Sequence, residues 1–284
     1  MAVEFGSCSP CEREGEFCLR IVVCIKQVPS TEAKVQMDPV KGTLIREGVE
    51  SVVNPFDEYA IEEGVRLKER YGGEVIAVSM GPPQAKDALR QALAMGADKA
   101  VLLSDRAFAG SDTLATAYTL SLAIKKLGEI DLVICGKQAT DGDTAQVGPG
   151  LAQRLGFRQL TYVCKVREIN LEGKKIVVER LLDEGVQVVE TTLPALMTVV
   201  KDINQPRLPN VISIRRAART EIPIWGPQDL NGDQDKFGFD GSPTQVVRIF
   251  TPPPRAGGQI LEGEVPEVVS KLLDALSSQQ VISI

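Results

Sequence analysis

The sequence of 284 residues contains no histidine. Histidine is the commonest acid–base group near neutral pH, the base of Ser-His-Asp triads and a frequent ligand of transition metals. Its absence excludes histidine-based proton transfer and histidine metal sites. We therefore expect binding or cofactor chemistry rather than hydrolysis.

Long apolar runs and an excess of positive charge are also missing. No stretch approaches the roughly 20 apolar residues of a membrane-spanning helix, and the N-terminus has no apolar core of a secretory signal. The 32 basic and 38 acidic residues give a net charge of −6, which argues against a nucleic-acid surface. We expect a cytoplasmic protein that reaches a membrane, if at all, only through its partners.

Six cysteines are present. Three of them, Cys24, Cys135 and Cys164, lie in expected strands or at their ends, and we expect all six to be reduced cytosolic thiols. The other three, Cys8, Cys11 and Cys18, lie in an N-terminal stretch without periodicity. An iron–sulfur or zinc site usually needs four protein ligands. We expect an appended extension without a metal, and the alternative is a site shared with another chain.

Apolar runs and amphipathic stretches alternate over residues 19–156. Four short runs have the composition of buried strands: residues 19–25, 74–79, 100–103 and 131–135. The helical patterns between them begin at good N-caps, Asn54 and Ser111 or Asp112, and end at glycines. This alternation predicts right-handed βαβ crossovers and a mostly parallel sheet.

The pattern changes after residue 156. Residues 163–169, 175–181 and 186–192 alternate with period two and predict an antiparallel meander at one edge of the sheet. Residues 195–200 form a further apolar strand. The composition then turns to Pro, Gly, Asn, Asp and Arg, which predicts a basic loop from Arg207 to Arg219 followed by an extended arm and a terminal helix over residues 263–277.

The segment GKQATDGDTAQVGP at residues 136–149 lies between the fourth strand and a helical pattern. Open parallel sheets bind ligands at such places, beyond the carboxyl end of a strand and at a helix N-terminus. Its residues offer N–H groups and neutral donors for phosphate, and carboxylates for ribose or amide groups. It matches neither the G-x-G-x-x-G nor the P-loop pattern. The alternative is a tight, well-capped turn. The expected cofactor contacts in this loop are Gly136, Lys137, Gln138, Asp141, Gly142, Asp143, Thr144, Ala145, Gln146, Val147 and Gly148.

Other segments are expected to meet the same edge of the sheet. They contribute the candidate contacts Cys24, Asn54, Asp57, Met80 and Gly81, and a helix start adds Asp112, Thr113 and Thr116. Each has a purely structural alternative: a buried thiol, an N-cap, a gap-filling side chain or a capping motif. Together they form the rim that a nucleotide at this edge would touch. The helix start would anchor a longer ligand, such as a dinucleotide.

We therefore expect an α/β fold with a mostly parallel sheet flanked by helices, a Rossmann-like adenine-nucleotide-binding core, an antiparallel edge meander and an extended C-terminal arm. The expected parts are residues 1–18 as an extension, 19–203 as the nucleotide-binding domain, 204–262 as the loop and arm, and 263–284 as a helix and tail. The basic cluster of Arg207, Arg215, Arg216 and Arg219 is either a solvated face or a protein-docking loop.

A series of ordered motifs resembles the beta subunit of electron transfer flavoproteins. The resemblance covers roughly residues 19–262, and its motifs are VCIKQV at 23–28, VNPFDE at 53–58, AVSMGP at 77–82, ALAMGAD at 92–98, GKQATDGD at 136–143, LPALMTV at 193–199 and PRLPN at 206–210.

The resemblance implies a subunit that pairs with a larger, flavin-carrying alpha subunit. It implies that the loop at 136–148, with Cys24, residues 54–57 and Met80, holds an adenine nucleotide. The segment between Thr192 and Asn210 would dock a partner flavin dehydrogenase or quinone oxidoreductase, and the arm would wrap the alpha subunit.

Two branches of this family differ in the nucleotide that the beta subunit holds. The form DGDTAQVGP at 141–149, together with SDTLAT at 111–116, is similar to the electron-bifurcating branch, which holds FAD there. This implies NADH as the electron donor, and ferredoxin or flavodoxin and the alpha-subunit FAD as acceptors. One alternative is a conventional beta subunit that holds AMP as a structural ligand and shuttles electrons from dehydrogenases. The other is a non-redox adenine-nucleotide-binding module.

Overall fold

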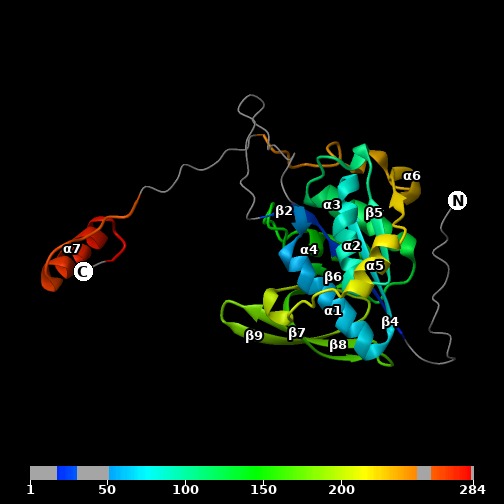
Figure 1. Cartoon of the computed structure of the whole chain (residues 1–284), viewed down its shortest axis with the longest axis horizontal. Coiled ribbons are helices and arrows are strands. Elements are labelled where there is room, and N and C mark those ends of the chain that lie inside the picture. Colours follow the sequence, from blue (N-terminus) through cyan, green and yellow to red (C-terminus); the bar gives the residue numbers. More distant parts are fainter. Residues whose placement is uncertain (1–17, 31–50, 248–256, 283–284) are drawn as a thin grey trace. The chain divides into compact units, whose positions relative to one another are not determined.

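The computed structural model describes residues 18–30, 51–247 and 257–282 (Figure 1). The chain forms two compact units, residues 1–247 and residues 248–284. The first unit carries the sheet and its covering helices, and the described part of the second carries the terminal helix.

A nine-stranded sheet forms the centre of the first unit, in the order β11-β5-β4-β1-β6-β10-β7-β8-β9. Neighbouring strands from β11 to β7 pair in parallel. The edge strands β8 and β9 add as antiparallel hairpins, so the predicted mostly parallel sheet with an edge meander is confirmed. The strands are β1 Leu19–Ile25, β4 Gly73–Met80, β5 Lys99–Leu103, β6 Leu132–Gly136, β7 Arg158–Asn170, β8 Lys175–Leu182, β9 Gly185–Thr192, β10 Ala195–Val199 and β11 Ile224–Trp225.

Helices cover both faces of this sheet (Figure 1). On one face lie α1 (Pro55–Tyr71) and α2 (Lys86–Met95), and on the other lie α3 (Thr113–Leu127) and α4 (Val147–Leu155). Side chains alternate along each strand, so Val23 packs toward α1 and α2 whereas Cys24 packs toward α3 and α4. Burial on both faces explains why the central strands are continuous apolar runs.

The structure differs from the sequence prediction between residues 204 and 247. The expected basic loop contains helix α5 (Val211–Arg219), whose N-cap Asn210 accepts a hydrogen bond from the Ser213 amide at 2.8 Å. Beyond it, β11 joins the sheet beside β5, and α6 (Pro227–Leu230) follows. The buried Ile222 and Trp225 explain this return to the sheet, because both remove large apolar side chains from water. The surrounding prolines and glycines predict a loop, and they obscured the apolar signals of Ile222 and Trp225.

Smaller elements complete the described chain. They are the 3-10 turns η1 (Pro83–Ala85), η2 (Arg106–Phe108), η3 (Lys201–Ile203) and η4 (Gln234–Lys236), and a two-stranded sheet of β2 (Gln27–Pro29) and β3 (Ser51–Val53). In the second unit, α7 (Val265–Ser278) exposes apolar side chains, including Val265 and Val269. No helix within the described ranges combines the length and the apolarity that a membrane crossing requires.

The cysteines divide into two groups. Cys24, Cys135 and Cys164 are free thiols, as expected. Cys18 is disulfide-bonded, so the expectation of a reduced thiol was wrong at this position. Cys8 and Cys11 lie outside the described residues. Among the residues that are described, no group of three or more Cys, Asp and Glu side chains could hold a metal ion.

Candidate functional site

The strand order reverses beside β1. Along the chain, β4 and β5 extend the sheet from one side of β1, and β6 then joins its other side. In open α/β sheets, ligands bind in the crevice at the carboxyl ends of the strands where such a reversal occurs. Lys26 follows β1 and Lys137 follows β6, so these two positions mark the crevice in the structure.

Asp57 joins the two strand ends at this crevice. Its carboxylate accepts the amide hydrogen of Lys26 at 2.7 Å through Oδ2 and that of Gly136 at 3.2 Å through Oδ1. The side chain is buried. Burial raises the pKa of Asp57 to about 7, against the opposing effect of its hydrogen bonds, because the charged form loses its hydration. This carboxylate therefore fixes the ends of β1 and β6 relative to each other.

Asn54 holds the loop at residues 136–148 against the start of α1. Its Nδ2 donates to the Gln138 carbonyl at 2.9 Å, and its Oδ1 accepts from the Thr140 amide at 3.1 Å. Asn54 makes no side-chain cap to its own helix, so the predicted capping role is replaced by a long-range one. The salt bridge from Lys26 Nζ to Asp141 Oδ1, at 2.7 Å, holds the loop from the β1 side.

The second half of the loop carries amide groups that can receive an anion. Among the described residues, no acceptor is found for the N–H groups of Thr144, Ala145 and Gln146. The first amides of α4, at Val147 and Gly148, are likewise outside the intrahelical ladder. Asp143 and Ala145 hold left-handed backbone conformations, with φ of 55° and 54°. Such strain in residues other than glycine concentrates at functional sites, and amides of this kind suit a phosphate.

The start of α3 lies beside the start of α4. Thr113 Oγ1 hydrogen-bonds to Gln146 Oε1 at 3.0 Å, which joins the two helix N-termini. Asp112 caps α3 through Oδ1, and its Oδ2 accepts from the Thr244 amide at 3.0 Å. Both oxygens of Asp112 are thus used within the chain. This geometry gives Asp112 a shaping role at the site.

Three glycines of the loop meet different surroundings. A Cβ at Gly136 would overlap Asp57 Oδ1 and lie 2.7 Å from Phe56 Cβ. A Cβ at Gly148 would overlap Thr198 Cγ2, whereas one at Gly142 would meet nothing within 4 Å. Gly136 and Gly148 therefore allow close packing under the loop, and Gly142 faces open space.

The remaining predicted contacts lie at the same edge of the sheet. Cys24 is paired in register with Cys135 on β6, and both are buried. The hydrogen bond with the neighbouring Cys24 thiol, together with burial, holds the pKa of Cys135 well above its usual range. Met80 ends β4 and Gly81 follows it, both half-buried, and Thr116 lies half-buried in the first turn of α3. The structure thus brings the predicted positions to one edge. Their contacts with a ligand stay a prediction.

Some residues at this site were missed by the sequence reasoning. Lys26 could have been found, since it directly follows a strand at the switch point. Thr198 packs under Gly148 and accepts from the Tyr162 amide at 3.1 Å. Ser242 accepts from the Asp112 amide at 2.8 Å. No local pattern signals either of these two contacts, because they join segments far apart in the sequence.

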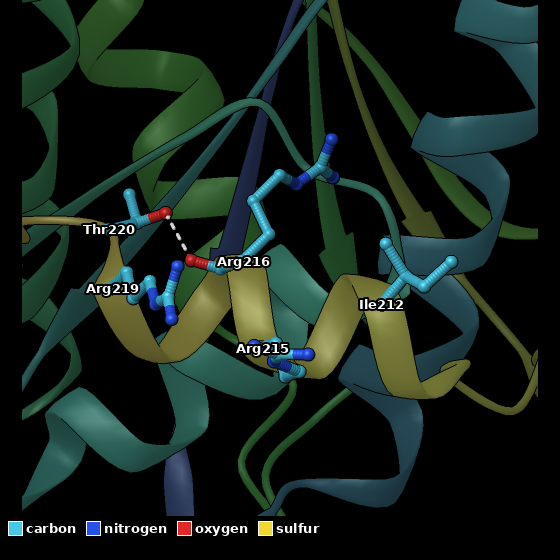
Figure 2. A pocket seen from close by; sticks show the side chains of 5 residues that line it. All are labelled: Ile212, Arg215, Arg216, Arg219 and Thr220. Carbon is cyan, nitrogen blue, oxygen red and sulfur yellow. Dashed lines mark hydrogen bonds between the residues drawn. The ribbon is translucent and has the colours of Figure 1, made fainter.

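A second candidate surface lies around α5. We define the docking face as the exposed residues Leu208, Val211, Ile212, Arg215, Arg216 and Arg219. Figure 2 shows Ile212, the three arginines and Thr220 around a hollow of about 460 Å³, with the Thr220 hydroxyl donating to the Arg216 carbonyl at 3.0 Å. Apolar and basic side chains thus gather on one helix of an acidic chain, as in a protein-docking surface.

Comparison with known proteins decides the family. Residues 41–230 match the electron transfer flavoprotein domain. An electron transfer flavoprotein subunit beta from Thermoanaerobacterium thermosaccharolyticum is 49% identical over 93% of this chain and all of its own length. The Protein FixA of Azorhizobium caulinodans is 51% identical over 84% of this chain and 86% of its own. The chain belongs to the electron transfer flavoprotein beta subunit and FixA family.

Another relative is the Caffeyl-CoA reductase-Etf complex subunit CarD of Acetobacterium woodii, 48% identical over 93% of this chain and all of its own length. Electron transfer flavoprotein beta subunits pair with an alpha subunit, and the family is associated with flavin and nucleotide. The resemblance stated from the sequence is therefore confirmed. The amides of residues 144–148 and the space at Gly142 fit the phosphate of such a group.

Proposed function

We propose that this chain is the beta subunit of an electron-bifurcating electron transfer flavoprotein, and that residues 136–148 hold an FAD. The observation that carries the proposal is the row of free amides at the start of α4, beside open space at Gly142. These groups suit a pyrophosphate that continues into a larger ligand. When bound, FAD supplies hydride acceptance from NADH and one-electron transfer to ferredoxin or flavodoxin and to the alpha-subunit FAD.

The residues of the chain bind and orient this cofactor without a catalytic acid of their own. Residues 141–148 contact the pyrophosphate and ribose. Asn54 and Asp57 hold the loop in place from α1. Cys24, Met80 and Gly81 line the strand ends, while Asp112, Thr113 and Thr116 extend the polar rim.

Protein partners occupy two further regions. The alpha subunit is wrapped by the arm that leads to α7, whose exposed Val265 and Val269 need an apolar cover. A flavin dehydrogenase or quinone oxidoreductase docks at the segment between Thr192 and Asn210, where Leu208 is 93% exposed. The relative named as a caffeyl-CoA reductase complex subunit supports a CoA-ester reductase or dehydrogenase as one such partner.

Quantifying the nucleotides of the purified heterodimer tests the proposal. The nucleotides are released by denaturation, separated by chromatography and counted per heterodimer. We expect two FAD. One FAD with one AMP would instead assign the conventional role, since the same amides can hold the single phosphate of AMP. A complex without any flavin would assign the non-redox nucleotide-binding role.

A further inference from the structure

Arg207 forms hydrogen bonds and ion pairs with two carboxylates of α1. Its Nε lies 2.7 Å from Glu62 Oε2, and its Nη1 lies 2.6 Å from Glu69 Oε1. Its Nη2 reaches both carboxylates, at 3.2 and 2.9 Å. Glu62 and Glu69 are seven residues, or two helical turns, apart on α1. One planar guanidinium therefore spans two carboxylates.

The backbone beside Arg207 is tied to the same helix. The Arg207 amide donates to Glu62 Oε2 at 3.1 Å. Asn204 Nδ2 donates to the Tyr59 carbonyl and to Glu63 Oε2, both at 3.0 Å. Arg66 Nη2 donates to the Gln205 carbonyl at 3.2 Å. Three of the four positions 204–207 are therefore held on α1 by side chains rather than by regular structure.

Charge stabilises the arrangement. The Glu62 side chain is only 2% exposed, against 34% for Arg207 and 52% for Glu69. Burial alone would raise the pKa of Glu62, but the hydrogen bonds from Arg207 and Arg66 bring it below its usual range. The contacts with Glu69 and Glu62 raise the pKa of Arg207. A buried carboxylate with two arginine partners is a fixed anchor, unlike an isolated surface ion pair.

Leu208, the next residue, is exposed to solvent rather than packed on α1. The Leu208 side chain is 93% exposed, although its backbone lies between the anchored Arg207 and Pro209. Pro206 and Pro209 restrict the φ angles on both sides, and Asn210 then caps α5. An apolar side chain is thus held out in water on a backbone that has little freedom. Much of its backbone entropy is therefore lost before any partner binds.

We propose that Arg207 is a positioning residue, which fixes the docking segment on α1 before a redox protein with an apolar socket binds Leu208. The inference rests on the proposed docking role of this segment. Preorganisation lowers the cost of binding without touching the reacting groups. The clamp is the set of contacts that Arg207 makes with Glu62 and Glu69. A variant that weakens the clamp therefore weakens docking and leaves electron transfer within the docked complex unchanged.

Glu69→Gln is the primary variant, because it removes one carboxylate of the clamp and leaves buried Glu62 paired. Arg207→Lys keeps the charge but loses the planar fork. Leu208→Ala removes the anchor itself. Glu172→Gln is the matched control, since Glu172 is exposed in the β7–β8 turn and has the same change of charge. All variants are studied in the full heterodimer, with the thermal unfolding midpoint recorded for each.

Trypsin reports the clamp without any partner. It must extract the Arg207 side chain from Glu62 and Glu69 to cut before Leu208. We expect the Glu69→Gln variant to be cut at this bond at least about threefold faster than the wild type and the Glu172→Gln control. Equal cleavage rates at an unchanged unfolding midpoint would overturn the proposal.

Steady-state kinetics report the docking, with a purified flavin-dependent CoA-ester dehydrogenase as the redox partner. We expect Glu69→Gln and Arg207→Lys to raise the KM for this partner about three- to tenfold at unchanged kcat. The increase should persist at high salt, where a pure charge effect is screened. A raised KM for Leu208→Ala alone would overturn the role of Arg207 and keep the docking segment. A KM unchanged in every variant would overturn the docking role and the inference with it.

Discussion

Asp57 illustrates how much one side chain can decide at this site. It is a first-turn residue of α1, where an acidic side chain is usually placed to favour the helix dipole. Here the carboxylate accepts backbone amides from the ends of both β1 and β6. It thereby connects the two strands at the switch point. Burial raises the pKa of this carboxyl group to about 7.

The raised pKa predicts a pH dependence of stability. Because folded Asp57 binds its proton more tightly than in the unfolded chain, its contribution is complete below about pH 4 and is lost as the pH rises to about 7. Asp57→Asn cannot titrate. We expect its unfolding free energy, measured by denaturant, to fall less between about pH 5 and 7 than that of the wild type. Burial also raises the pKa of Glu58 and Glu63, so some slope remains in the variant. An identical slope in both proteins would assign the effect to those two groups.

Asp141 offers a test of ligand contact at the same scale. Its salt bridge with Lys26 is partly exposed, so its loss should change stability by less than about 1 kcal/mol. If Asp141 also contacts the nucleotide, Asp141→Ala should weaken nucleotide binding about tenfold, which corresponds to about 1.4 kcal/mol. The measurement is the nucleotide retained per heterodimer after dialysis. Asp183→Ala, at an exposed turn, is the control. Full retention in Asp141→Ala would move the contact elsewhere in the loop.

At the scale of elements, α1 connects the two functional regions. Its start holds the loop at residues 136–148 through Asn54 and Asp57. Further along, Glu62 and Glu69 hold the segment that presents Leu208. The polar face of α1 makes contacts with segments that are distant in the sequence, whereas the polar face of an ordinary amphipathic helix faces solvent. One continuous helix therefore sets the position of both regions on the sheet.

The close approach of α1 and β6 predicts different costs for two glycine substitutions. Gly136→Ala would place a methyl group into Asp57 and Phe56, so we expect a loss of about 1–3 kcal/mol in unfolding free energy and loss of bound nucleotide. Gly142→Ala is the matched control for stability alone, since nothing lies within 4 Å of its Cβ. Differential scanning calorimetry on both variants compares them. Equal unfolding midpoints would mean that the strand and helix separate more easily than their packing indicates.

At the scale of the whole molecule, the chain divides into a compact α/β unit and a terminal unit with one helix. The exposed apolar side chains of α7, among them Leu272 and Leu273, have no cover within the described part of their own unit. Such a helix needs a partner surface. The exposed helix agrees with the proposed role of this unit in assembly with the alpha subunit.

Removing the second unit should separate folding from assembly. A variant that ends at Val247 should keep the unfolding midpoint of the first unit within a few degrees, because that unit has its own core. It should bind the alpha subunit at least about tenfold more weakly in titration calorimetry. Leu272→Asp in the full chain tests the helix face alone. Unchanged affinity in both variants would place the subunit interface on the first unit.

Local sequence patterns predicted many of the strands and helix ends. The strands at 19–25 and 74–79, the cap at Asp112 and the glycine that ends α2 at Gly96 follow from periodicity and capping chemistry. Helix α5 and strand β11 were missed, because their signals are short and stand among prolines and glycines. The positions of the loop residues were predicted, but their contacts were not. Asn54 was expected to cap α1 and instead reaches residues 138 and 140, more than 80 positions away.

The sequence by itself determined the alternation of strands and helices, the place of the loop at residues 136–148 after β6 and the family to which the chain belongs. These properties depend on burial and backbone conformation over a few residues, which leave a local pattern. Only the tertiary structure decided that Asp57 joins β1 to β6 and that Arg207 lies between Glu62 and Glu69, 145 and 138 positions earlier. Such contacts depend on which surfaces meet when the sheet assembles, and periodicity within one segment carries no information about its neighbour across the fold.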